Sequence, residues 1–207
     1  MKKLLTLTCA ALLFAGVLHA QIEKGTIFLG TSTTIAGSSY DLLTGTNNSI
    51  GITHSSMDWG DGDEKEKYTI LNFSPKLGFF IANNLVVGAN MKLWTQKIDD
   101  SKTSISGIGP FVRYYFTDGK IVPFAEAEAT FSTYKETWDS DYSDGESKEK
   151  LNMFALGAGA AFFVNDFISI DGMLGYKNMK LKDAESSDDS EISFNNFGFT
   201  IGFTATF

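Results

Sequence analysis

The sequence predicts an all-β fold: an eight-stranded antiparallel transmembrane β-barrel with long external loops and short periplasmic turns. Three observations lead to this prediction. Eight stretches alternate large apolar side chains with small or polar ones, which is the period of a β-strand. Each stretch is long enough to cross a bilayer as a tilted strand, which takes about 9 to 11 residues. The connections between the stretches alternate between short and long, as they do in transmembrane barrels.

The predicted strands cover most of the chain after its first twenty residues. They are residues 25–36, 68–81, 85–97, 104–116, 121–134, 151–164, 167–179 and 192–207. The connections after the second, fourth and sixth strands are tight, whereas those after the first, third, fifth and seventh are longer and polar. Three of the long connections carry most of the acidic residues, in "DWGDGDEKE", "ETWDSDYSDGESKE" and "DAESSDDSE". We expect these to be solvated surface loops.

The first twenty residues have the layout of a secretory signal peptide. In "MKKLLTLTCAALLFAGVLHAQ" two lysines precede an apolar run, and a small alanine stands just before Gln21. This order is typical of export signals. The apolar run is shorter than the roughly 20 residues that a membrane-spanning helix needs. We therefore expect residues 1–20 to be removed and residues 21–207 to form one barrel domain.

Removal of this segment changes the chemistry that the chain offers. Cys9 is the only cysteine, so the mature chain has no disulfide, no thiol nucleophile and no cysteine metal ligand. Loss of Lys2 and Lys3 leaves 15 basic against 25 acidic residues, a net charge near −10. Such an acidic chain is a poor partner for nucleic acid, whose phosphates attract cations.

The last eleven residues, "FGFTIGFTATF", show the strand pattern most clearly. Every second side chain is apolar and mostly large, and the side chains between them are only Gly or Thr. A half-buried strand of a soluble protein carries charged or long polar residues on its second face. A small, uncharged face suits the interior of a narrow barrel, which leaves the Phe-rich face toward lipid. A soluble lipocalin-like barrel would need the opposite facing.

The same alternation, followed along the other strands, brings charged residues into the barrel. Four cations and three carboxylates fall on inward positions: Lys76, Lys92, Arg113, Lys177, Glu126, Glu128 and Asp171. Buried charges need partners, and this set is close to balanced. The reversed facing would cost roughly 2 to 4 kcal/mol for each Lys or Arg at the bilayer midplane. We predict a structural charge network in the lumen, and interpret the Glu126–Glu128 pair as part of it rather than as an acid–base pair.

Two phrases carry a resemblance to a known family. "SPKLGFFIANNLVVGANM" and "GPFVRYYF" look like the repeated hairpins of the outer membrane protein β-barrel domain family, and the chain resembles small barrels of the OmpX kind. The resemblance covers the whole mature chain. It implies a place in the outer membrane of a Gram-negative cell, among its lipids and lipopolysaccharide. It also implies that the barrel-assembly machinery reads the last strand as an insertion signal, through Phe199, Ile201, Phe203, Ala205 and Phe207.

The acidic connections do not match a known metal-binding pattern. In a twelve-residue calcium loop starting at Asp139, the required glycine would fall on Asp144 and the final glutamate on Lys150, so the pattern fails. We expect no specific metal site and no cofactor. Weak divalent bridging between the acidic loops and anionic lipopolysaccharide remains a hypothesis.

A catalytic role would have to use His54, the only histidine outside the signal segment. It lies in "THSSMDW", which we place in the long first loop. With Asp139 and Ser140 it would mimic the residues of lipid A-modifying barrels only if the first and third loops met at the rim. One histidine among many serines is weak support for such a set. We therefore predict a solvated loop histidine and no catalytic residues.

We thus expect a non-enzymatic, monomeric envelope protein. Its barrel would anchor acidic loops for adhesion, defence or surface stabilisation, through an extracellular ligand that the sequence does not identify. A narrow passive channel is the alternative, because inward glycines leave space in an interior that eight strands would otherwise fill. A lipid A-modifying enzyme is the third possibility.

Overall fold

A computed structural model describes residues 22–36, 50–57, 66–98, 101–138, 145–183 and 191–207. These residues form ten strands: β1 (Ile27–Ala36), β2 (Ile50–Met57), β3 (Glu66–Phe73), β4 (Lys76–Ala82), β5 (Leu85–Ile98), β6 (Ser101–Tyr115), β7 (Ile121–Trp138), β8 (Gly145–Phe163), β9 (Ile168–Asp183) and β10 (Glu191–Thr206). Within this described part, no helix is both long and apolar enough to cross a membrane.

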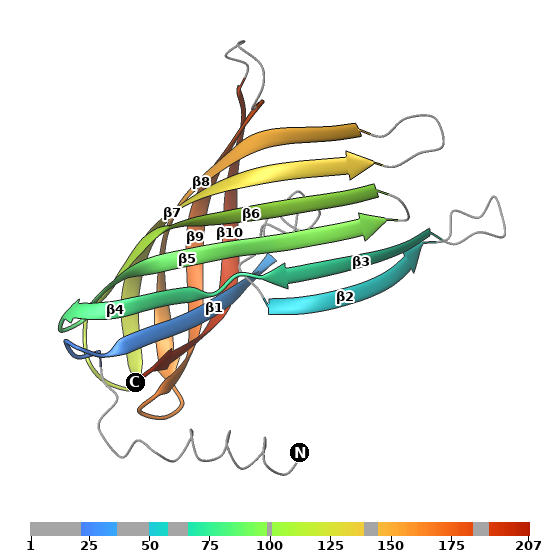
Figure 1. The fold of residues 1–207 in the computed structure, drawn as a ribbon. Coiled ribbons are helices and arrows are strands. Elements are labelled where there is room, and N and C mark those ends of the chain that lie inside the picture. Colours follow the sequence, from blue (N-terminus) through green and yellow to red (C-terminus); the bar gives the residue numbers. More distant parts are fainter. Residues whose placement is uncertain (1–21, 37–49, 58–65, 99–100, 139–144, 184–190) are drawn as a thin grey trace.

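Eight of these strands form a hydrogen-bonded ring. Its order is β5-β4-β1-β10-β9-β8-β7-β6, and β6 pairs with β5 to close it (Figure 1). All the pairings are antiparallel. The first strand pairs with the last, from Phe28 opposite Thr206 to Ala36 opposite Phe199. The predicted eight-stranded antiparallel barrel is therefore confirmed, and ring closure removes the open edge that a lipid environment does not tolerate.

The predicted strand 68–81 is divided into β3 and β4, which both pair with β5. The division falls at Ser74 and Pro75. Proline has no N–H to donate to a ladder, which explains a break at this point. The carbonyl of Pro75 still accepts a hydrogen bond of 2.9 Å from the N–H of Met91 on β5. The two pieces therefore occupy a single position in the barrel wall.

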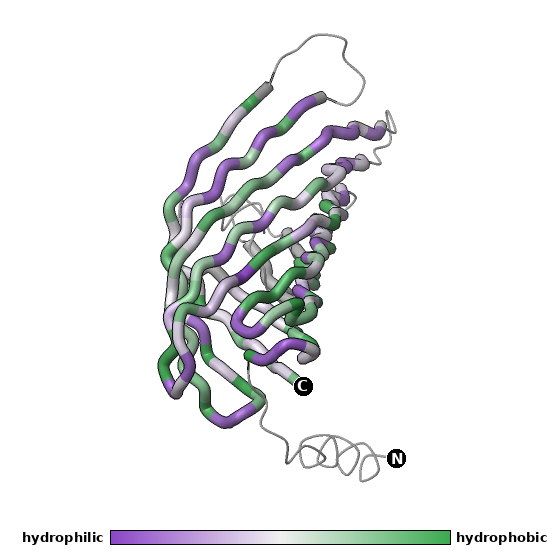
Figure 2. Tube along the Cα trace, turned by 90° about the vertical axis from the view of Figure 1, so that its left-hand side faces the viewer, coloured by the Kyte–Doolittle hydropathy of each residue, from purple (hydrophilic) through white to green (hydrophobic). Residues whose placement is uncertain are grey.

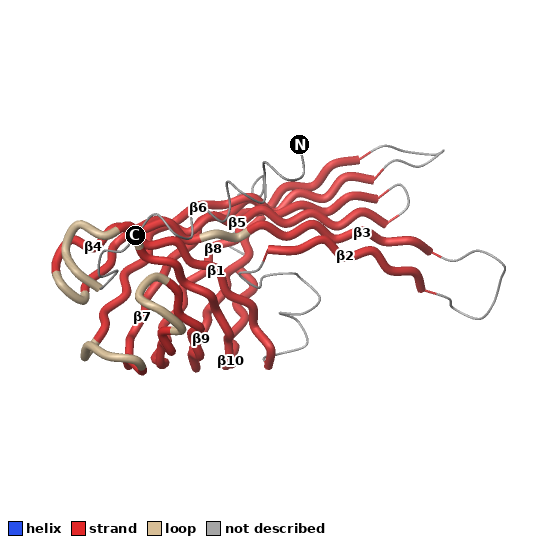
Figure 3. The backbone as a smooth tube through the Cα atoms, turned by 90° about the horizontal axis from the view of Figure 1, so that it is seen from below, coloured by secondary structure: helices blue, strands red, loops and turns tan. Residues whose placement is uncertain are grey.

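The extra strand β2 lies within the segment that the sequence assigned to the first long loop. It pairs with β3 from Ile50 opposite Phe73 to Met57 opposite Glu66, with His54 opposite Thr69. The prediction of a loop histidine was wrong in this respect, because His54 belongs to a strand. The alternation of Ile50 and Ile52 is too short to stand out among Gly, Ser and Asn. Figures 1 and 3 show β2 and β3 running on beyond the ring, away from the C-terminus.

The other three long connections are shorter than predicted, and the one between β9 and β10 is reduced to residues 184–190. β7 and β8 form a continuous ladder out to Trp138 opposite Gly145, so much of "ETWDSDYSDGESKE" is strand. Only residues 99–100 separate β5 from β6. Both faces of the β7–β8 extension are largely polar, which hides the apolar period while the backbone ladder continues. A side chain at Gly145 would meet the indole of Trp138, which covers this glycine.

The three tight turns lie at the end of the barrel that also holds the C-terminus, here called the turn end (Figure 1). The β4–β5 turn has Asn84 at φ 67°, a left-handed conformation that Asn tolerates well. The β6–β7 turn has Gly119 at φ 127°, where a side chain would be strained. Phe207 and Ile27 exchange two backbone hydrogen bonds of 2.7 and 3.0 Å. The first and last strands are thus joined to the very end of the chain.

The strand faces separate as the sequence predicts. Outward apolar side chains are exposed, such as Leu156 at 63% and Leu174 at 67%. Inward ones are buried, such as Phe80 and Val86, both at 0%. Figure 2 shows hydrophilic residues recurring along the ends of the strands that lie farthest from the turn end. The exposed apolar surface therefore belongs to the wall, and the packed core of this chain is its lumen.

Candidate functional site

Aromatic residues fill the lumen near the turn end. Phe28, Phe80 and Tyr115 are 0% exposed and Phe124 is 1% exposed. The rings of Phe80 and Tyr115 are stacked with centroids 6.0 Å apart, and Tyr115 and Phe124 are 5.9 Å apart. These side chains come from β1, β4, β6 and β7, so rings from several walls meet at the barrel axis. We call these four residues the aromatic plug.

The segment before β1 adds to the plug. Ile22 is only 6% exposed and belongs to the same hydrophobic cluster. Its carbonyl accepts a hydrogen bond of 2.7 Å from the N–H of Asn84. The N–H of Lys24 donates to Oδ1 of Asn83 at 3.1 Å. The segment that enters β1 is thereby held across the β4–β5 turn.

Arg113 lies against this plug and carries the central charge of the lumen. Its guanidinium carbon is 4.2 Å from the ring centre of Phe124 and 5.0 Å from that of Phe28. Such stacking suits the planar, weakly hydrated guanidinium. Nε donates to Oε2 of Glu126 at 2.6 Å, and Nη1 donates to Oδ2 of Asp171 at 2.5 Å. Arg113 therefore joins β6 to β7 and, across the lumen, to β9.

Asp171 is supported by hydroxyl groups as well as by Arg113. Ser169 donates from Oγ to Oδ1 at 2.6 Å. Thr204, on the last strand, donates from Oγ1 to Oδ2 at 2.8 Å. Asp171 and both hydroxyl residues are buried. A buried carboxylate with three donors has most of its lost hydration replaced.

Lys76 on β4 extends the network from Glu126 to Glu128. Its Nζ lies 2.5 Å from Oε1 of Glu126 and 2.7 Å from Oε2 of Glu128. Glu128 also accepts a hydrogen bond of 3.3 Å from Nδ2 of Asn90. Thr130 then donates to Oδ1 of Asn90 at 3.0 Å. The charges thus continue into a chain of neutral polar groups that reaches β5.

The whole arrangement crosses the barrel through side chains. Contacts among these residues link β4, β5, β6, β7, β9 and β10. Breaking a buried ion pair is costly, because the remaining partner keeps a charge in a medium of low dielectric. Chemically, the network can hold the strands together and fill the bore.

Five of the seven predicted lumen residues meet in this network: Lys76, Arg113, Glu126, Glu128 and Asp171. The other two also occupy inward positions in the lumen. Lys92 is buried on β5, and Lys177 on β9 lines a small cavity. The role of the seven residues as one functional network remains a prediction.

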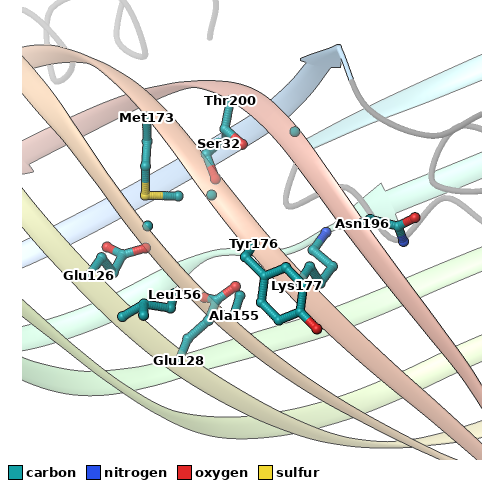
Figure 4. A pocket seen from close by; sticks show the side chains of 13 residues that line it. Ser32, Glu126, Glu128, Ala155, Leu156, Met173, Tyr176, Lys177, Asn196 and Thr200 are labelled. Carbon is teal, nitrogen blue, oxygen red and sulfur yellow. The ribbon is translucent and has the colours of Figure 1, made fainter.

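The cavity has a volume of about 40 Å³ and lies between β7 and the β8–β10 wall (Figure 4). Its polar lining includes Glu126, Glu128, Lys177 and Asn196. Three glycines on inward positions leave space for it, because they have no side chains: Gly157, Gly175 and Gly198. A polar space of this volume suits a few water molecules.

Sequence reasoning did not identify the neutral partners of the charges. They are Asn90, Tyr115, Thr130, Ser169 and Thr204. Four of them lie an even number of residues from a predicted inward charge on the same strand, and Thr204 lies on the inward face of β10. The signal was therefore present in the parity, but a neutral polar side chain on an inward position is too common to be singled out.

The remaining predicted residues are placed only in part. On β10 and just after it, Phe199, Phe203 and Phe207 are exposed on the outer wall, with Ile201 and Ala205 half-buried on the same face. Their role as an insertion signal stays a prediction. Asp139, Ser140 and the signal segment 1–20 lie outside the described residues, so the contact that His54 would need with the third loop stays untested. Among described residues, no three His, Cys, Asp or Glu side chains cluster as metal ligands would.

Comparisons with known proteins identify the family. The outer membrane protein β-barrel domain family matches residues 8–207. No curated protein matches the chain in sequence. Among solved structures, it is similar to Neisserial surface protein A, with 15% identity, a TM-score of 0.45 and coverage of 89% of this chain and 100% of that one. It is also similar to Ail, the attachment invasion locus protein of Yersinia pestis, with 12% identity, a TM-score of 0.43 and coverage of 89% of this chain and 99% of that one. The N-terminal barrel domain of OprF from Pseudomonas aeruginosa is similar with 10% identity, a TM-score of 0.43 and coverage of 89% of this chain and 98% of that one. The chain belongs to the outer membrane protein β-barrel domain family, and is a small β-barrel protein of the cell outer membrane.

Proposed function

We propose that this protein is a non-conducting, non-enzymatic anchor in the outer membrane. The observation that carries the proposal is the filled lumen. Arg113 is paired with Glu126 and Asp171 and is stacked on Phe124 and Phe28. A solute that crossed the barrel would have to separate these buried ion pairs and displace the aromatic plug. Both steps are costly, because each would leave buried charged or apolar groups without their partners.

The anchor would display its outer strand extensions and acidic connections to the exterior. β7 and β8 continue well past the apolar part of the wall, to Trp138 and Gly145. β2 and β3 add a hairpin beside the ring. If the interior of the barrel is closed, its function lies in contacts made by these elements, in adhesion, defence or stabilisation of the surface. Connecting segments on a rigid scaffold are the usual place for such contacts.

Planar-bilayer conductance of the folded mature protein tests this proposal. We expect no steady current above the lipid baseline, while a heat-dependent gel shift verifies that the protein is folded. A general porin inserted under the same conditions is the positive control. A reproducible, steady current from the wild-type protein would contradict the anchor and favour a conduit.

A narrow conduit is the second candidate, and the small polar cavity is the observation that favours it. Glu128 and Lys177 line that cavity beside glycines, so a thread of water is its natural content. If the cavity is part of a path, Arg113→Ala should raise an already measurable conductance. If the lumen is closed, the same variant should lose stability before it conducts.

A further inference from the structure

The outer wall becomes more polar in successive layers toward the loop end of the barrel, which lies opposite the turn end. The apolar surface ends at aromatic residues: Phe131 and Phe154 have ring centres 6.2 Å apart, and those of Tyr176 and Phe197 are 5.4 Å apart. Aromatic residues of this kind mark the membrane interface in barrels. Two residues farther along their strands the outward positions hold Thr133, Asn152, Asn178 and Asn195. The apolar wall is thus followed by a belt of hydroxyl and amide groups.

Hydrogen bonds organise this amide belt on the β9–β10 side. Tyr176 donates from its hydroxyl to Oδ1 of Asn195 at 2.6 Å. Asn178 donates from Nδ2 to the same oxygen at 2.7 Å and to Oγ of Ser193 at 3.1 Å. These groups face the surroundings of the barrel. They form an ordered polar surface immediately beyond the aromatic girdle.

Beyond the amide belt, the outward positions of five strands hold lysines. We call them the lysine belt: Lys97, Lys102, Lys135, Lys148, Lys150, Lys180 and Lys182. Three pairs of them lie directly opposite one another on neighbouring strands: Lys97 and Lys102, Lys135 and Lys148, and Lys150 and Lys182. Like charges in directly opposite positions destabilise a sheet. Their repetition is unexpected in a chain with a formal net charge of −8.

One pair shows how such a wall accommodates an anion. Glu146 lies 2.7 Å from Nζ of Lys135 and 2.5 Å from Nζ of Lys148, so a carboxylate bridges the two ammonium groups. The pair Lys150 and Lys182 has Lys180 on the same face of β9, and Lys182 lies opposite Glu191 in register. Three lysines of the described strands, Lys150, Lys180 and Lys182, thus lie together on the outward face of β8 and β9. Lys180 and Lys182 each also take part in an interaction within the protein.

We propose that the outer wall of β8 and β9 binds a phosphorylated glycolipid of the surrounding leaflet, with a phosphate between Lys150, Lys180 and Lys182. The lysines lie four to six residues beyond Phe154 and Tyr176. At about 3.3 Å per residue and a strand tilt of about 40°, they stand roughly 10 to 15 Å above the apolar wall. The acyl chains then contact the apolar wall, the sugar hydroxyls contact the amide belt, and flexible lysine stems reach the phosphates.

The site differs from divalent bridging by the acidic connections, because it needs no metal ion and uses described side chains on strands. It is also independent of the closed lumen, since every residue involved faces outward. A conducting barrel would leave it intact.

Titration calorimetry of the mature protein folded in detergent micelles tests the site. The probes are diphosphoryl lipid A, the same lipid with its phosphates removed, and inorganic phosphate. We expect diphosphoryl lipid A to bind at least about tenfold more tightly than the dephosphorylated form, because the lysines attract its phosphates. High salt should reduce the difference.

The double variant Lys150→Gln/Lys182→Gln should lose this preference, while Lys24→Gln/Lys120→Gln keeps it. The control removes two exposed lysines from the turn end and changes the net charge equally. A heat-dependent gel shift verifies that both variants fold. Equal binding of the two lipid forms by wild type, or an unchanged preference in Lys150→Gln/Lys182→Gln, would overturn the proposal. Displacement of the lipid by equimolar inorganic phosphate would also overturn it, because the site would then recognise a free anion.

Discussion

Lys76 and Glu126 lie 2.5 Å apart in the lumen, and Lys135 and Glu146 lie 2.7 Å apart on the outer wall. The side chains of the first pair are 3% and 2% exposed, and those of the second are 39% and 40% exposed. Nearly equal distances thus occur in very different surroundings. An exposed pair gains little, because water and salt screen it. A buried pair must remain intact, because either partner alone would be an uncompensated charge.

The two regions also differ in how their charges are distributed. In the lumen, Arg113 has a carboxylate on two sides, and opposite charges alternate through the network. On the wall, lysine lies opposite lysine in three cross-strand pairs. The lumen charges neutralise one another, whereas the lysines of the wall face the surroundings of the barrel. We propose that the lumen charges maintain the fold and that the wall lysines contact the surrounding leaflet.

The largest effect should come from Arg113→Ala. It removes the cation that faces both Glu126 and Asp171. We expect the free energy of unfolding to fall by about 3 to 5 kcal/mol, the usual cost of an unpartnered buried charge. Urea unfolding of the protein inserted in lipid vesicles measures it.

Two further variants complete this comparison of lumen and wall. Lys135→Ala, on the exposed pair, should change the unfolding free energy by less than about 1 kcal/mol. Arg113→Lys keeps the charge but loses the planar fork, and should fall between wild type and Arg113→Ala. Equal losses for Arg113→Ala and Lys135→Ala would contradict the distinction between the two regions.

A smaller effect is expected from glycine substitutions that distinguish the interior from the wall. A Cβ at Gly109, on the inward face of β6, would meet the backbone carbonyl oxygen of Ala129 on β7. Gly109→Ala should therefore cost about 1 to 3 kcal/mol through strand displacement. At Gly172, on the outward face of β9, the nearest atom is a ring carbon of Phe199 at 3.6 Å, an ordinary contact. Gly172→Ala is the matched control in the same unfolding assay, and should be close to neutral.

The smallest effect concerns the exposed pair itself. Hydrogen bonds from Lys135 and Lys148 hold the pKa of the Glu146 carboxyl below its ordinary value of 4.5. A lowered carboxyl pKa stabilises the folded state above the unfolded pKa, and this stabilisation is lost as the pH falls through the folded value. Because the range from pH 5 to pH 7 lies above the unfolded pKa, we expect Glu146 to contribute no resolvable change in the unfolding midpoint within it.

Carbon-detected NMR titration of the Glu146 side chain measures this pKa directly. It should lie below 4.5 in wild type and move back toward that value in Lys135→Gln/Lys148→Gln. A wild-type value at or above 4.5 would show that the two lysines do not hold the carboxylate in solution.

Much of the lumen could be predicted because strand parity is a local property. Once β6 and β7 are placed, Arg113 and Glu126 must face inward, whichever strands they meet. Their partners across the barrel could not be predicted in the same way. Arg113 and Asp171 are 58 residues apart and meet only because the ring closes with a particular stagger. Pairing of this kind depends on the register of every strand between them.

The missed strands have physical explanations of another kind. On β7, Lys135, Glu136 and Thr137 continue the strand with polar residues on both faces, because this part lies beyond the apolar wall. Without an apolar period, only backbone pairing with β8 shows that it is a strand. The break at Pro75 is local, but a single proline does not reveal that both sides still pair with β5.

Cysteine accessibility tests the closed lumen most directly. The only native cysteine, Cys9, lies in the predicted signal peptide, so single cysteines can be placed freely in the mature chain. Ala155→Cys lines the lumen cavity, its neighbour Leu156→Cys faces lipid, and Lys148→Cys is exposed on the strand extension. The probe is a small, charged, membrane-impermeant thiol reagent, added to either side of vesicles that contain the folded protein. We predict that Lys148→Cys reacts readily while Ala155→Cys and Leu156→Cys react only after unfolding. Rapid reaction of Ala155→Cys in the folded protein, from either side, would contradict a sealed lumen.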